Sequence, residues 1–223
     1  MSIAPPAPRR PAGPPWRYLL GGVPCDERSY GWREPEGLDS PHRARPATSV
    51  FVRLVAATLR ARFAFSLSGE LPALGCVVVS HHDSYWDGVV AAALDPRVAP
   101  ITSGNWRSIP VVGSVLRSYG VLWTDDQTVA SATALVRRGA ACWIAPRGFD
   151  RARENPAHLG AARICVAAGA PLVPMSLSGL ARPARRPRSP AAIAIWPPVM
   201  PAPGESAEAF AERLEGLLPR SVY

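Results

Sequence analysis

Short apolar runs alternate with segments of helical periodicity along most of this chain, and this alternation limits the folds open to it. The predicted strands are 76–80, near 98–102, 120–124, 141–145, 171–177 and 191–196. The predicted helices are 48–65, 84–94, near 108–119, 127–138, 157–168 and 206–218. Strands and helices in alternation form sheets whose strands run mainly parallel beneath covering helices. We therefore predict an α/β fold, with a mixed, largely parallel sheet covered by helices.

The two ends of the chain differ in composition, which suggests a domain boundary. Residues 1–47 form a Pro/Arg-rich N-terminal arm that we expect to be partly disordered, and residues 48–223 form the α/β domain. The longest uncharged stretch, 164–181, contains Gly169, Pro171 and Pro174, which favour helix, turn and strand over a membrane span. No transmembrane helix and no signal peptide are expected, so the predicted location is cytoplasmic or peripheral to a membrane.

The charge of the chain is strongly basic and comes from arginine alone. All 25 basic residues are Arg, the formal net charge is +8, and the absence of Lys excludes a lysine nucleophile. A basic surface favours acidic partners such as phosphorylated cofactors, an acidic carrier protein or anionic lipid headgroups, although it also occurs on ordinary soluble proteins. The arginines are scattered and no recognition module is visible, so we expect no nucleic-acid binding.

The cysteines give no sign of a metal or disulfide framework. Cys25, Cys76, Cys142 and Cys165 are widely spaced and contain no C-x-x-C pair. The last three lie in apolar segments, where we expect them to be buried as small hydrophobic residues.

A histidine and a carboxylate follow the predicted strand 76–80. His82 lies in the turn after the strand and Asp87 in the first turn of the next helix, at the edge where α/β sheets usually bind substrates. Asp87 would reach one imidazole nitrogen, leaving the other to accept a proton from a substrate hydroxyl. Two alternatives stay open, because Ser84-x-x-Asp87 is also a capping box and His81 with His82 is also a possible metal pair.

Four segments resemble, in order and spacing, the motif blocks of a known family. Residues 81–87 (His-His-Asp-Ser-Tyr-Trp-Asp) match a block Asn-His-x-Ser-x-x-Asp, and residues 120–126 correspond to Gly-x-x-Phe-Ile-Asp-Arg. Residues 145–151 correspond to Phe-Pro-Glu-Gly-Thr-Arg-Ser, and 173–177 to a Val-Pro-Val-x-Ile block. From about residue 63 onward the chain resembles the glycerolipid acyltransferases typified by 1-acylglycerol-3-phosphate acyltransferase.

This resemblance implies a glycerol-3-phosphate acyltransferase-like fold and a function in phospholipid biosynthesis. A fatty acyl group would pass from acyl-CoA or acyl carrier protein to a hydroxyl of a lysophospholipid or related lipid. His82 would be the general base and Asp87 its orienting carboxylate, with no metal and no cofactor besides the thioester co-substrate. The implied substrate-binding residues are Ser84, Asp126, Arg147 and Gly148. The enzyme would work as a peripheral protein at an anionic membrane surface, on the inner face of the cell membrane.

Two departures from the family pattern invert charges. Asp126 stands where the second block has Arg, and Arg147 stands where the third block has Glu. One hypothesis is that the two residues form an ion pair that preserves the site while changing what it recognises. The alternative is drift in a member that has lost its original acceptor.

Two other functions stay open at this point. The first is a metal-dependent hydrolase that uses His81, His82, Asp83 and Asp87, for which bound metal and loss of activity on chelation are the discriminating observations. The second is a non-catalytic relative that binds a lipid surface, for which His82→Ala is expected to have no effect.

Overall fold

A computed structural model of the chain describes residues 57–59, 61–82, 84, 86–95, 97–104, 106, 113–114, 116, 120–146, 159–180 and 188–218. The predicted arm over 1–47 lies outside the described residues, so the proposed domain boundary stays a prediction. Most of the predicted helix near 108–119 lies outside them as well.

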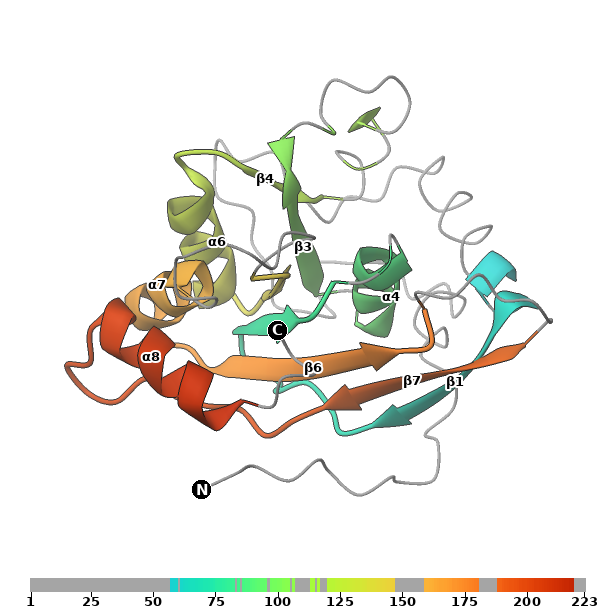
Figure 1. The fold of residues 1–223 in the computed structure, drawn as a ribbon. Coiled ribbons are helices and arrows are strands. Elements are labelled where there is room, and N and C mark those ends of the chain that lie inside the picture. Colours follow the sequence, from blue (N-terminus) through green and yellow to red (C-terminus); the bar gives the residue numbers. More distant parts are fainter. Residues whose placement is uncertain are drawn as a thin grey trace.

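The described residues form a sheet of seven strands, in the order β1-β7-β6-β2-β5-β3-β4. Figure 1 shows β6, β7 and β1 side by side at one edge of the sheet and β3 with β4 at the other. The strands are β1 (Phe63–Ser68), β2 (Cys76–Ser80), β3 (Val98–Ser103), β4 (Leu122–Thr124), β5 (Ala141–Ile144), β6 (Leu172–Ser178) and β7 (Ser189–Ile195). The helices are α4 (Trp86–Leu94), α6 (Thr128–Arg137), α7 (Leu159–Ala168) and α8 (Ala207–Leu217). Only the β6–β7 pairing is antiparallel among the strand pairs described. The mixed, largely parallel sheet predicted from the sequence is confirmed.

The sheet has an apolar core on each face, and β2 contributes to both. Val77 and Val79 pack in the cluster that contains α6, α7 and α8, whereas Cys76 and Val78 pack in the cluster that contains α4. This division follows from the strand geometry, because successive side chains point to opposite faces. All five residues of β2 are buried, as expected for a central strand covered by helices on both sides.

The direction of each crossover explains which face its helix covers. The chain passes from β2 through α4 to β3 in one direction across the sheet, and from β5 through α7 to β6 in the other. Because crossovers between parallel strands are nearly always right-handed, opposite directions place the helices on opposite faces. The reversal occurs between the neighbouring strands β2 and β5, and the carboxyl ends of strands at such a point usually flank a binding crevice.

The predicted helix over 48–65 is wrong at its C-terminal end. Residues 57–59 and 61–62 are helical, but strand β1 begins at Phe63. From Phe63 to Ser68, large apolar residues alternate with Ala or Ser. Phe63 and Ile193 pack in the same core cluster. The partner strand β7 lies more than a hundred residues later in the sequence. The helical spacing before Phe63 therefore extended the predicted helix into a segment that pairing with a distant strand holds as β-structure.

Other boundaries differ by one or two residues from those predicted. Strand β4 starts at Leu122 rather than at Gly120, which adopts a positive φ of 85° in the preceding turn. Helix α8 starts after Ser206, whose side chain accepts a hydrogen bond from the Ala209 N–H and so caps the helix. In the part of the chain that the structure describes, no helix combines the length and apolar character that crossing a bilayer requires.

Candidate active site

His82 and Asp87 lie at the carboxyl end of β2, beside the point where the crossovers change direction. His82 follows the last residue of β2 by two positions, and Asp87 is the second residue of α4. Strand β5 is the neighbour of β2 on the side toward β3 and ends at the same edge of the sheet. The predicted placement of the pair at a strand's end therefore agrees with the structure.

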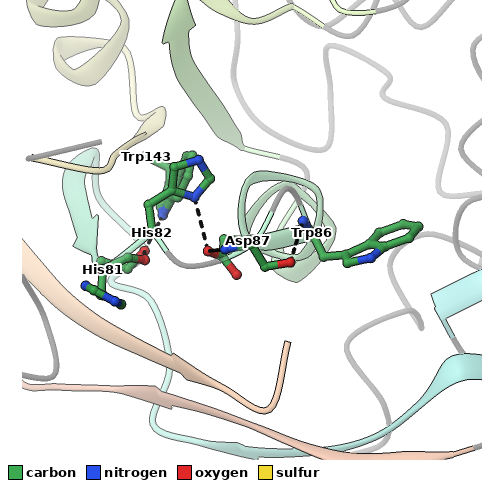
Figure 2. Close-up of polar contacts among 7 residues, drawn as sticks. His81, His82, Trp86, Asp87 and Trp143 are labelled. Atoms are coloured by element: carbon green, nitrogen blue, oxygen red, sulfur yellow. Dashed lines mark hydrogen bonds and ion pairs between the residues drawn. The ribbon is translucent and has the colours of Figure 1, made fainter. Parts of the chain in front are cut away.

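The two side chains face one another in a hydrogen-bonded pair. Nδ1 of His82 lies 3.1 Å from Oδ2 of Asp87, and Figure 2 shows the imidazole turned toward the carboxylate. The carboxylate side chain is only 3% exposed, whereas the imidazole is 18% exposed. An ionised carboxylate only accepts hydrogen bonds, so this contact assigns a proton to Nδ1. Nε2, on the other side of the ring, is then the basic nitrogen of the neutral imidazole.

The carboxylate of Asp87 also caps its own helix. Oδ2 accepts a hydrogen bond of 2.8 Å from the Ser84 N–H, and Oγ of Ser84 accepts one of 3.1 Å from the Trp86 N–H. These reciprocal contacts form a capping box, which fixes the start of α4 and satisfies the backbone amides of Ser84 and Trp86. The capping and His-pairing interpretations of Asp87 are therefore not exclusive, because one oxygen serves both.

Ser84 was predicted to bind substrate, and the structure gives it a helix-capping contact. The residue is 9% exposed, and its Oγ lies at the first turn of α4. A role in binding substrate stays a prediction.

Asp126 is exposed, in the turn between β4 and α6. Its neighbour Asp125 organises that turn by accepting a 2.9 Å hydrogen bond from the Gln127 N–H. Arg147 and Gly148 lie outside the described residues, so the proposed Asp126–Arg147 ion pair stays a prediction.

His81 differs from His82 in direction. Its side chain extends away from Asp87, on the other side of the strand end (Figure 2). Among the described residues, no group of three or more His, Cys, Asp or Glu is placed to hold a metal ion. Asp83, the fourth residue of the metal site considered above, lies outside the described residues.

Two residues beside the pair were not predicted from the sequence. The indole of Trp143, in β5, meets the His82 ring edge to face with centroids 5.8 Å apart, and its Nε1 donates to Oγ of Ser80. The available signals were a serine at the end of an otherwise apolar strand and a tryptophan two residues before the third motif block. Neither signal indicates a partner without the pairing of β2 with β5.

The buried cysteines were predicted correctly. Cys76, Cys142 and Cys165 are buried free thiols. Burial raises the pKa of Cys76 and of Cys142 to about 12 and also raises the pKa of Cys165. A thiol reacts as its thiolate, so these three are unsuited to act as nucleophiles near neutral pH.

Comparisons with known proteins bear on the family and the fold of this chain. A family model described as Acyltransferase matches residues 62–178, a range that contains all four motif blocks. The crystal structure of the 1-acyl-sn-glycerophosphate (LPA) acyltransferase PlsC from Thermotoga maritima is similar in fold, with a TM-score of 0.58 and 19% identity. The match covers 92% of this chain and 89% of that one. No curated protein sequence matches this chain significantly. Since the family model spans more than half of its length, the chain belongs to the Acyltransferase family and is an acyltransferase enzyme.

Proposed function

We propose that this enzyme transfers a fatty acyl group from an acyl thioester, either acyl-CoA or acyl carrier protein, to a hydroxyl of a lysophospholipid or related lipid. The observation that carries the proposal is the His82–Asp87 pair, 3.1 Å apart at the carboxyl end of a central strand in an Acyltransferase-family chain. The likeness to a structure whose protein is a 1-acyl-sn-glycerophosphate acyltransferase supports a lipid acceptor.

The proposed chemistry needs one base and no enzyme nucleophile. Nε2 of His82 accepts the proton of the acceptor hydroxyl as its oxygen attacks the thioester carbonyl. The carbon–oxygen bond forms, the tetrahedral intermediate collapses, and the carbon–sulfur bond breaks. The thiolate leaves with the proton that the imidazolium returns, so the products are an ester and a free thiol. Asp87 keeps Nδ1 protonated and stabilises the positive charge that His82 carries in between.

The acceptor site is proposed to involve Ser84, Asp126, Arg147 and Gly148, with no metal and no resident cofactor. The inverted charges at Asp126 and Arg147 support an acceptor that differs from the family's usual phosphate-bearing one. An arginine in the third block would hold a phosphate of the donor or acceptor by paired hydrogen bonds.

Thiol release from acyl-CoA, measured with a panel of lysophospholipid and glycolipid acceptors, tests the proposal directly. Acceptor-dependent release by the purified protein, with the acylated lipid seen by mass spectrometry, is the expected result. Release that stays undiminished in His82→Ala refutes the proposed base. Activity that a chelator abolishes and added metal restores would instead favour the metal-dependent hydrolase.

We further propose that the enzyme works at the inner face of the cell membrane, as a peripheral protein on anionic lipid. The net charge of +8 supports this location. Sedimentation with vesicles tests it: binding to vesicles that contain phosphatidylglycerol, weakened by salt, is expected. Equal binding to purely zwitterionic vesicles contradicts it.

A further inference from the structure

We infer that Ser80 and Trp143 are positioning residues for His82, which hold its ring toward Asp87 and its backbone at the end of β2. The inference rests on the proposed function, because it assigns these residues a role in the work of His82. Ser80 is fully buried and Trp143 is 4% exposed, so both act through other residues and not by touching substrate.

A chain of hydrogen bonds links Trp143 to the peptide that precedes His82. Nε1 of Trp143 donates to Oγ of Ser80 over 2.8 Å, and Oγ of Ser80 donates to the carbonyl oxygen of His81 over 3.2 Å. That carbonyl belongs to the peptide bond whose nitrogen is the backbone nitrogen of His82. The hydroxyl therefore fixes the turn from which the imidazole projects, and the indole fixes the hydroxyl.

The indole also meets the imidazole itself. The two rings are 5.8 Å apart between centroids, with an interplanar angle of 80°, in the edge-to-face arrangement that aromatic pairs favour. In Figure 2 the His82 ring overlaps Trp143 while its nitrogen faces the carboxylate of Asp87. A swing of the whole imidazole about χ1, away from Asp87, would also move it off the indole.

The indole is itself held against α4, the helix that carries Asp87. A Cβ built at Gly88 would lie 3.2 Å from Cζ3 of Trp143, so the indole packs closely on the helix at that position. Trp143 thus contacts the strand end that carries His82 and the helix turn that carries its partner. Its position sets the separation of the two catalytic elements.

A second buried tryptophan provides the contrast. Trp196 is 7% exposed and follows β7, and its Nε1 has no hydrogen-bond partner among the described residues. Its indole is not placed against His82 by any described contact. Trp196→Phe is therefore a matched control, with the same loss of volume and of an indole N–H outside the site.

The experiment compares Trp143→Phe, Ser80→Ala and Ser80→Thr with Trp196→Phe, each alone and in the His82→Ala background. Rates of acyl transfer give kcat and KM, circular dichroism and Tm report the fold, and two-dimensional NMR follows the His82 ring cross-peaks. The resonances of His82 are identified by their loss in His82→Ala.

We expect Trp143→Phe and Ser80→Ala to lower kcat about 10-fold or more with little change in KM, because a misplaced base weakens the chemical step. Both should shift the His82 cross-peaks, and Ser80→Thr should restore kcat in part by restoring the hydroxyl. In the His82→Ala background, Trp143→Phe and Ser80→Ala should not lower the residual activity any further. If both residues act only through His82, their effects disappear once His82 is removed. Trp196→Phe should leave kcat and the cross-peaks unchanged.

Two results overturn the inference: cross-peaks that do not move in Trp143→Phe or Ser80→Ala, or losses of kcat that persist at the same size in the His82→Ala background. Absence of acyl transfer in the wild type with every acceptor refutes the proposed function instead. In that case the NMR comparison still decides whether these residues hold the ring, since it requires no turnover. The deciding variant is Ser80→Ala, because it removes no aromatic ring whose loss would itself shift the His82 signals.

Discussion

Oδ2 of Asp87 accepts hydrogen bonds both from Nδ1 of His82, at 3.1 Å, and from the backbone amide of Ser84, at 2.8 Å. The oxygen that pairs with the proposed base is therefore the one that closes the first turn of α4. This double contact ties the orientation of the imidazole to the start of a helix, and a buried carboxylate is stable there because both contacts satisfy it.

Replacing Asp87 by Asn is expected to lower kcat by about 10²–10⁴-fold, because the amide no longer stabilises the imidazolium or enforces a proton on Nδ1. Steady-state kinetics give the loss, and circular dichroism checks the fold. Asp95→Asn is the control, since Asp95 is paired with Arg97 beyond the other end of α4. Equal losses in the two variants contradict an orienting role for Asp87.

Ser84 and Ser206 both cap helices, but only Ser84 lies at the proposed active site. Ser84→Ala and Ser206→Ala each remove a side chain that accepts a hydrogen bond from the first turn of a helix. Each is expected to cost about 1 kcal/mol of unfolding free energy, measured by urea denaturation. Only Ser84→Ala should also reduce acyl transfer, because its helix carries Asp87 and because Ser84 itself is proposed to contact the acceptor. An unchanged rate in Ser84→Ala means that the cap does not constrain the site.

Replacing a helical glycine by alanine is expected to have different effects on stability at Gly216 and at Gly88. Gly216→Ala, in α8, places its Cβ where nothing lies within 4 Å, and it is expected to raise the unfolding free energy by about 0.5–1 kcal/mol. Gly88→Ala has the same propensity gain, but its Cβ crowds Trp143 at 3.2 Å. We expect no net stabilisation there, together with a loss of activity. A Gly88→Ala enzyme with full activity and higher stability means that the indole yields without disturbing His82.

The free energy of unfolding should decrease in acid because Glu205 becomes protonated. Arg213 donates two hydrogen bonds to this carboxylate, at 2.8 and 2.6 Å, and holds its pKa at about 2, below the ordinary 4.5. A pKa lowered by folding contributes stability that is complete above about pH 4.5 and is lost as the pH falls toward 2. Glu205→Gln should therefore have a lower Tm than the wild type at pH 7, and the difference should shrink between pH 4.5 and 2. A difference in Tm that does not vary with pH rules out this ion pair as its source.

The buried thiols should resist alkylation in the native protein. The raised pKa values of Cys76, Cys142 and Cys165 leave almost no thiolate at pH 8, and burial excludes the reagent. Peptide mapping after treatment with iodoacetamide should find these three modified only after denaturation. Modification of Cys142 in the folded enzyme contradicts the closed core around it.

The sequence alone determined the alternation of elements, the placement of His82 and Asp87 at a strand end, and the burial of three cysteines. These features depend on local periodicity and on residue type, which can be identified without knowing which distant segments pack against one another. The motif blocks added the family, because their order and spacing are properties of the chain itself.

Tertiary structure alone decided the rest. Strand β1 requires β7 as its partner, and its short alternation begins directly after residues with helical spacing, so the point where helix gives way to strand was not predicted. The contact of Trp143 with Ser80 and His82 depends on β5 lying beside β2, 63 residues away from Ser80 in the chain. The pairing of β5 with β2 follows from the directions of the crossovers. Strand order depends on how helices pack on both faces of the sheet, and the sequence of a single strand does not determine it.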